Sequence, residues 1–197
     1  MHELAGSILT DHGWRRGRIR YDGHVRAVDG RPLDVPRPPY IVPGFVDLHL
    51  HGGGGADVMT GEAAVRRTAM IHARHGTTAL VPTTVTAPVE DIDAALAGIE
   101  AVRRAPAAGE AQVLGAHLEG PFLNPDKLGA QPPYARAPAP DLLRHWAETA
   151  RVLLVTYAPE CDPETLLPGA LRRLGIRGQL GHSLADDATA RRALDAG

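Results

Sequence analysis

The sequence has little cysteine, little net charge and no long apolar run, and each shortage excludes a class of protein. Its 197 residues include one cysteine, Cys161, so no internal disulfide framework is possible, and the cytoplasm, a reducing compartment, is the expected location. The net charge of −2 offers no broad attraction to nucleic acid or to an anionic membrane. No apolar run approaches about 18 residues, so no membrane span is expected. The first ten residues lack the basic segment and the following apolar run of a signal peptide. We therefore expect neither a nucleic-acid nor a membrane partner.

Residues 1–40 differ in pattern from the rest of the chain. Short strand-like pieces at 18–21 and 24–28 are bounded by the turn dipeptides Asp-Gly, and 31–40 is a proline-rich connection. So small a β-rich segment would bury too little surface to be stable alone. We expect 1–40 to be the N-terminal part of a small β-sandwich domain that needs a partner sheet or a larger domain.

Residues 41–197 alternate between short apolar runs and segments with helical spacing. The predicted strands are 41–50, 77–81, 112–117, 152–157 and 177–181, and the predicted helices are 62–75, 89–104, 140–149, 163–174 and 185–196. Five such β-then-α units favour an α/β fold with a parallel sheet, of the (β/α)8 TIM-barrel type. A closed barrel usually takes about 250 residues, so only about the first five units are expected here. An open doubly wound sheet is the alternative, although no Gly-x-Gly-x-x-Gly follows the first strand.

The motif with the clearest chemistry lies at the end of the first predicted strand of that region. Alternate residues share a face of a strand, so Asp47, His49 and His51 should point the same way. Two imidazoles at the carboxyl end of a barrel strand can both reach one metal ion. The glycine run 52–55 lacks the Gly-Lys-Ser/Thr of a phosphate-binding loop. We expect these glycines to let the backbone turn tightly beside a crowded metal centre.

Two later strand ends add further ligand candidates. Glu119 follows the third strand, in phase with His117, and His182 follows the fifth strand, where Ser183 can cap the next helix. Without a metal, His49 and His51 would be two partly exposed loop histidines, Glu119 would be a surface glutamate, and the segment around His182 would only cap the next helix. Taken together, nitrogen and oxygen donors without thiolates predict a site for Zn²⁺, with Fe²⁺ or Mn²⁺ as alternatives.

In this order, the three motifs resemble the N-acetylglucosamine-6-phosphate deacetylase family of the amidohydrolase superfamily. The most specific part is His-Leu-Glu-Gly-Pro-Phe-Leu-Asn-Pro from His117, followed by Lys-Leu-Gly-Ala-Gln at 127–131. The tripeptide Ala-Pro-Glu at 158–160 also recurs in that family. The resemblance extends over most of the chain and is closest in four segments, 43–57, 117–131, 156–160 and 181–183.

The resemblance implies a role for each matching residue. His49 and His51 would bind one metal position, Glu119 would be shared or bridging, and His182 would serve a second position with a histidine some twenty residues further on. One or two ions are therefore expected. Asp47 would support the first-strand ligands from behind. The substrate-contacting stretch would include Ala130 and Gln131, near the N-acetyl group of the sugar.

The implied reaction is metal-assisted hydrolysis of N-acetylglucosamine 6-phosphate to glucosamine 6-phosphate and acetate. The partner is thus a small amino-sugar phosphate, and a homodimer is expected for the full-length parent. The resemblance puts the general-base aspartate at the end of an eighth strand, past residue 197, so the chain alone is expected to bind metal without turnover. One alternative is another amidohydrolase that acts on a cyclic or linear amide, which the Glu-Gly-Pro-Phe segment disfavours. The other is an inactive metal-binding fragment.

Overall fold

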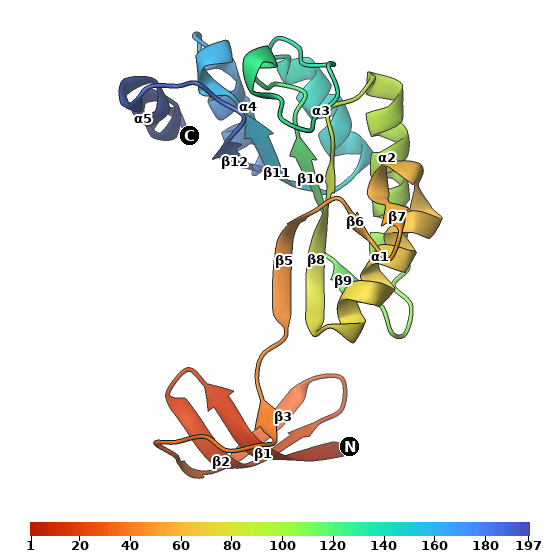
Figure 1. Ribbon diagram of the computed structural model, residues 1–197, viewed down its shortest axis with the longest axis vertical. Coiled ribbons are helices and arrows are strands. Elements are labelled where there is room, and N and C mark those ends of the chain that lie inside the picture. The colour runs from red at the N-terminus through yellow and green to blue at the C-terminus, as the bar shows by residue number, and fades with distance from the viewer. The chain divides into compact units, whose positions relative to one another are not determined.

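A computed structural model describes residues 1–197 and divides them into two compact units, residues 1–44 and 45–197 (Figure 1). The first unit is a four-stranded sheet with the order β3-β2-β1-β4. Its strands are β1 (His2–Thr10), β2 (Gly13–Tyr21), β3 (Val25–Pro32) and β4 (Tyr40–Ile41). Strands β1 and β2 form an antiparallel hairpin paired along its whole length, and β4 lies parallel to β1.

Two details of this unit differ from the sequence prediction. The β1 strand was not expected, because its centre, Ala-Gly-Ser, has neither β-branched side chains nor a clear alternation. Tyr40 and Ile41 pair with β1 in the small sheet, whereas the apolar pattern had joined Ile41 to the first strand of the second unit.

The second unit is built on parallel strands with the order β12-β11-β10-β8-β5. These strands are β5 (Phe45–Leu50), β8 (Thr77–Thr84), β10 (Ala116–Glu119), β11 (Val152–Tyr157) and β12 (Arg177–Leu180), with the short β9 (Gln112–Val113) beside β8. The connecting helices are α1 (Glu62–Arg74), α2 (Val89–Arg104), α3 (Pro140–Thr149), α4 (Leu166–Leu174) and α5 (Asp187–Ala196). Strands that are neighbours in the sheet are also successive along the chain, apart from the short β6 (Gly52–Gly53), β7 (Ala56–Asp57) and β9. A doubly wound sheet would reverse that order, so the five units form part of a (β/α)8-type barrel, as predicted.

The core of this unit lies between the sheet and its helices, which cover one face of the strands (Figure 1). Alternate strand residues such as Leu80, Leu118 and Val155 are fully buried against the helices. They meet apolar helix residues at helical spacing, among them Ile92, Leu96, Trp146, Leu167 and Leu171. By alternation, His117 and Glu119 lie on the opposite, concave face of the strands, together with apolar residues such as Val81. No helix combines the length and apolar character of a membrane span.

Three element boundaries differ from the prediction for local reasons. The second predicted strand continues past Pro82 to Thr84, although a proline normally weakens a strand assignment. The third is divided into β9 and β10 at Gly115, where a Cβ atom would lie 2.5 Å from the carbonyl oxygen of Arg151. Helix α4 begins at Leu166, because the Asp162 carboxylate accepts hydrogen bonds from the backbone N–H groups of Leu166 and Leu167.

Candidate metal centre

Four side chains from three strand ends converge on the concave side of the sheet. Their donor atoms are closely spaced: His49 Nε2 lies 3.2 Å from Glu119 Oε1, and His51 Nε2 lies 3.1 Å from Glu119 Oε2. His182 Nε2 is 3.2 Å from Glu119 Oε1, and the two imidazole Nε2 atoms of His49 and His51 are 3.3 Å apart. The ligand atoms of His49, His51 and Glu119 all lie within 4.8 Å of one another. The four predicted ligands are therefore brought together around one carboxylate.

The other ring nitrogens show why this cluster suits a cation. His51 Nδ1 lies 3.0 Å from the carbonyl oxygen of Thr83, and His182 Nδ1 lies 2.8 Å from that of Lys127. A carbonyl oxygen can only accept, so each Nδ1 carries a hydrogen, and when such a ring is neutral it presents the lone pair of Nε2. Those lone pairs face the oxygens of Glu119. Such an arrangement is repulsive unless a proton or a metal ion lies between the donors, so the donor set fits a divalent metal.

The protonation behaviour of the two central groups follows from the same contacts. Hydrogen bonding to Glu119 raises the pKa of His51 above its ordinary value, against the effect of burial. Burial would raise the pKa of Glu119, but hydrogen bonding from His51 and the charges of His49 and His51 outweigh it and lower this pKa to about 2. The carboxylate is thus ionised near neutral pH and available as a metal ligand.

The carboxylate is deep in the cluster and the imidazoles are nearer to solvent. The side chain of Glu119 is 8% exposed, while those of His49 and His51 are 47% and 40% exposed. The simple alternation predicted for β5 does not hold, because its register with β8 shifts between Asp47 and Leu50 and His51 lies in the bend after the strand. The two rings still meet. The Asp47 carboxylate accepts the backbone N–H of His49 at 3.1 Å.

A buried histidine beneath the cluster was not among the predicted site residues. His117 is fully buried, and its ring packs edge-on against that of His49, with centroids 4.9 Å apart. Its Nε2 lies 2.7 Å from Thr156 Oγ1 and its Nδ1 lies 3.2 Å from Thr83 Oγ1. Burial, reinforced by the charge of His49, lowers the pKa of His117 to about 4. The one sign of His117 in the sequence is its phase with Glu119. Thr83 is not among the predicted site residues because the predicted strand 77–81 ends before it, whereas β8 continues to Thr84.

The two predicted substrate-contacting residues are placed differently. Gln131 Nε2 donates to Glu119 Oε2 at 2.5 Å, and Gln131 Oε1 accepts the backbone N–H of Thr86 at 2.6 Å. This amide therefore adjoins the metal cluster. Ala130 is an exposed loop residue.

The glycine run has a reason other than the one expected. Strands β6 (Gly52–Gly53) and β7 (Ala56–Asp57) form a small hairpin whose turn, Gly54 and Gly55, has φ of 61° and 77°. A Cβ atom on Gly53 would lie 2.8 Å from the side chain of Ile71 in α1. The turn and the approach to α1 require glycine here, rather than crowding by the metal centre.

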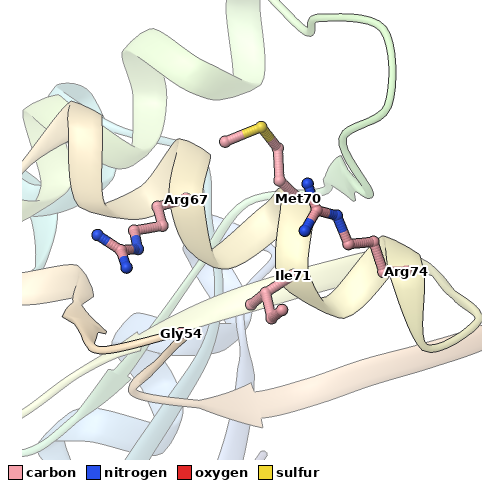
Figure 2. Close-up of a pocket in the computed structure, with 5 residues that line it drawn as sticks. All are labelled: Gly54, Arg67, Met70, Ile71 and Arg74. Carbon is pink, nitrogen blue, oxygen red and sulfur yellow. The ribbon is translucent and has the colours of Figure 1, made fainter.

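A separate surface pocket of about 400 Å³ lies against α1. Figure 2 shows its lining of Gly54, Arg67, Met70, Ile71 and Arg74. Its ionisable groups are two guanidinium groups, which offer donors but no metal ligand. None of the predicted site residues lines it, so this pocket is distinct from the cluster.

Comparison with known proteins was made against protein families and curated sequences. Residues 40–167 match the sequence model of the Amidohydrolase family. The chain is 38% identical to N-acetylgalactosamine-6-phosphate deacetylase of Escherichia coli O157:H7 over 98% of its own length and 53% of that protein. It is 34% identical to N-acetylglucosamine-6-phosphate deacetylase of Bos taurus over 98% of its own length and 50% of that protein. The chain thus spans about half the length of the curated relatives it matches.

Comparison with solved structures also finds amino-sugar-phosphate deacetylases. The chain superposes on N-acetyl-D-glucosamine-6-phosphate deacetylase of Mycobacterium smegmatis with a TM-score of 0.87 and 31% identity, covering 100% of this chain and 54% of that one. A D267A mutant of that enzyme in complex with N-acetyl-D-glucosamine-6-phosphate superposes with a TM-score of 0.86 and 31% identity, covering 99% of this chain and 53% of the mutant.

Proposed function

The chain belongs to the amidohydrolase family, and from that membership we propose that it carries the metal-binding part of a hydrolase. Its substrate is N-acetylglucosamine 6-phosphate, and the products are glucosamine 6-phosphate and acetate. The observation that carries this proposal is the convergence of His49, His51 and His182 on the carboxylate of Glu119. Relatives named N-acetylglucosamine-6-phosphate deacetylase, at 34% and 39% identity, support the choice of substrate.

The donor set favours Zn²⁺ in one or two positions, with Fe²⁺ or Mn²⁺ as alternatives, because it combines imidazole nitrogens with a carboxylate and has no thiolate. A bound divalent ion would polarise the acetamide carbonyl and activate water for its hydrolysis. Glu119, being ionised, holds the centre from the buried side, and the rings of His51 and His182 present their Nε2 atoms from the solvent side.

The remaining polar groups near the cluster position the ligands and the substrate. Asp47 holds the backbone of His49 and so orients the first pair of ligands. Gln131 adjoins Glu119, and we propose that its amide donates to the N-acetyl oxygen of the sugar, with Ala130 forming the adjacent wall. Glu119 and Asp47 are both engaged as acceptors, so we assign the general base to neither.

The test uses the native protein purified from its source cells, so that every polypeptide accompanying these residues is present. Acetate release from N-acetylglucosamine 6-phosphate should require a divalent metal and should be abolished by a chelator or by Glu119→Gln. His12→Ala, which removes an exposed histidine from a turn of the first unit, is the matched control and should retain both activity and metal content. Acetate release that is unaffected by the chelator or by Glu119→Gln would refute the proposal.

A second sugar is favoured by one observation, the 38% identity to the N-acetylgalactosamine-6-phosphate deacetylase. The two substrates differ only in the configuration of one hydroxyl, so the same assay should be run with both. A preference for N-acetylgalactosamine 6-phosphate would change the proposed substrate but not the proposed reaction. Hydrolysis of neither sugar would refute the proposed reaction.

The whole protein is proposed to be a cytoplasmic homodimer. The free thiol of Cys161 and a sugar phosphate as substrate fit a reducing compartment. Cell fractionation and analytical ultracentrifugation of the native protein test both statements, and a membrane-bound or monomeric protein would contradict them.

A further inference from the structure

Glu160, in the short helix η3 (Pro159–Cys161), joins two loops that contribute to the metal centre. Its Oε1 accepts hydrogen bonds from Asn124 Nδ2 at 2.8 Å and from the backbone N–H of Leu184 at 2.5 Å. Its Oε2 accepts the hydroxyl of Ser183 at 2.6 Å. Asn124 lies in the loop after β10, and Ser183 and Leu184 lie in the loop after β12. One half-buried carboxylate therefore holds the ends of three neighbouring units together.

These contacts fix the backbone at His182 and at the two residues that follow it. Asn124 donates its backbone N–H to the carbonyl oxygen of His182 at 3.1 Å, and Glu160 binds the two residues that follow His182. Asn124 also caps the short helix η2 (Pro125–Lys127) by accepting the N–H of Asp126. The last carbonyl of η2, that of Lys127, is the group that receives Nδ1 of His182. The backbone and the ring of His182 are thus both connected to Glu160.

His182 needs such support because its backbone is in an unfavourable conformation. Its φ of 51° lies in the left-handed region, which is uncommon for any residue other than glycine, although histidine adopts it more often than most, and which persists only where the surrounding structure holds it. A histidine relaxed to negative φ would redirect its ring, which now lies with Nε2 3.2 Å from Glu119. The hydrogen bonds at His182 and at the two residues after it hold the backbone in this conformation.

We propose that Glu160 is a positioning residue of the metal centre: through Asn124, Ser183 and Leu184 it holds His182 in the conformation that turns Nε2 towards Glu119. This inference rests on the proposed metal function. It gives a role to the Ala-Pro-Glu tripeptide, which the ligands themselves do not explain. The hydrogen bonds of the Glu160 carboxylate go to Asn124, Ser183 and Leu184 and to none of the four candidate ligands, so it acts through the loops.

A purely structural role is the competing explanation, and the chain contains a matched control for it. Asp162, two residues further on, is also a carboxylate that accepts two backbone N–H groups, but it caps α4 and contacts neither loop of the metal centre. Asp162→Ala should lower the melting temperature and leave the dissociation constant for metal within about twofold of the wild-type value, because the cap affects only helix stability.

The experiment is a titration of the metal-free chain with Co²⁺, whose visible spectrum reports ligand geometry. Glu160→Ala should weaken Co²⁺ binding by about 10- to 100-fold, as expected when an outer-shell partner is lost, and should alter the spectrum. Glu160→Gln keeps one acceptor oxygen for Asn124 and Leu184 and should restore binding to within about tenfold of wild type; it also serves if the alanine variant does not fold. Wild-type affinity and spectrum in Glu160→Ala, or equal weakening in Asp162→Ala, would overturn the inference.

A measurement without metal separates this inference from the proposed function. Imidazole ¹⁵N and ¹H spectra of the metal-free protein should show a hydrogen on Nδ1 of His182, bonded to the carbonyl oxygen of Lys127, in the wild type, and partial loss of that signal in Glu160→Ala. If the wild-type chain binds no metal, the proposed function fails, while the comparison of the Nδ1–H signals still decides the role of Glu160. An unchanged Nδ1–H signal in Glu160→Ala would refute that role.

Discussion

Two threonines on the strands that flank β10 should respond in opposite ways to replacement by valine. Thr156 in β11 and Thr84 in β8 are both buried, and valine matches threonine in shape while replacing the hydroxyl by a methyl group. The Thr156 hydroxyl lies 2.7 Å from Nε2 of buried His117. The Thr84 hydroxyl is buried without any hydrogen-bond partner.

The difference in environment sets the sign of each effect. Thr156→Val leaves Nε2 of a fully buried imidazole without a partner, which should lower the free energy of unfolding by about 1–3 kcal/mol. Thr84→Val removes a hydroxyl that is already desolvated and unpaired. It should therefore be neutral or should raise the free energy of unfolding by up to about 1 kcal/mol. Because the His117 ring supports that of His49, Thr156→Val should also weaken metal binding by no more than about tenfold.

Urea denaturation of the metal-free variants measures both free energies, and an unchanged slope with denaturant would show that the unfolded states are comparable. A double variant, Thr156→Val with Thr84→Val, should be additive to within about 0.5 kcal/mol, since the two side chains share no partner. Equal destabilisation by the two single substitutions would refute the hydrogen-bond argument, because their volume changes are the same.

Three further outcomes follow from other parts of the second unit. Hydrogen bonding from Arg103 is the main cause that lowers the pKa of Glu100 from an ordinary 4.5 to about 2. The ionised Glu100 therefore contributes at most about 3 kcal/mol to the free energy of unfolding, which is present above pH 4.5 and is lost as the pH falls towards 2. In an acid titration, Glu100→Gln should lack this pH-dependent loss of stability. Gly53→Ala should destabilise the fold by about 1–3 kcal/mol, measured by thermal melting, because its Cβ would meet Ile71 at 2.8 Å; unchanged stability would contradict the packing. Adding Zn²⁺ at about 100 times its dissociation constant should stabilise the wild type by about 2.7 kcal/mol, and a chelator or Glu119→Ala should abolish that gain; equal stabilisation of the variant would contradict the ligand assignment.

Much of the second unit could be predicted because its signals are local. The ranges of α2, α3 and β11 follow from helical spacing, a proline at the first turn of α3 and a compact apolar run. The strand order then follows from the repeated β-then-α pattern. The four candidate ligands were identified because parallel strands bring their carboxyl ends to one edge, so distance along the chain did not matter.

The features that escaped prediction depend on contacts between distant segments. Nothing near β5 indicates its register shift, which arises from pairing with β8. The partners of His117 come from two other strands, and a buried histidine cannot be distinguished from an exposed one by its neighbours in sequence. The role of Glu160 depends on loops some 36 and 23 residues away along the chain. A short tripeptide contains no information about such partners.

The order of the strands bears on how the centre forms during folding. Every pairing between the major strands of the second unit joins neighbours in sequence, so each can form after closure of a single connection that contains one helix. Contact between Glu119 and His182 instead spans 63 residues and needs the units that begin with β10, β11 and β12 all docked. We therefore expect the donor set to assemble late on the folding pathway. A bound ion would then act mainly on the rate of unfolding, making the fold longer-lived without making it form faster.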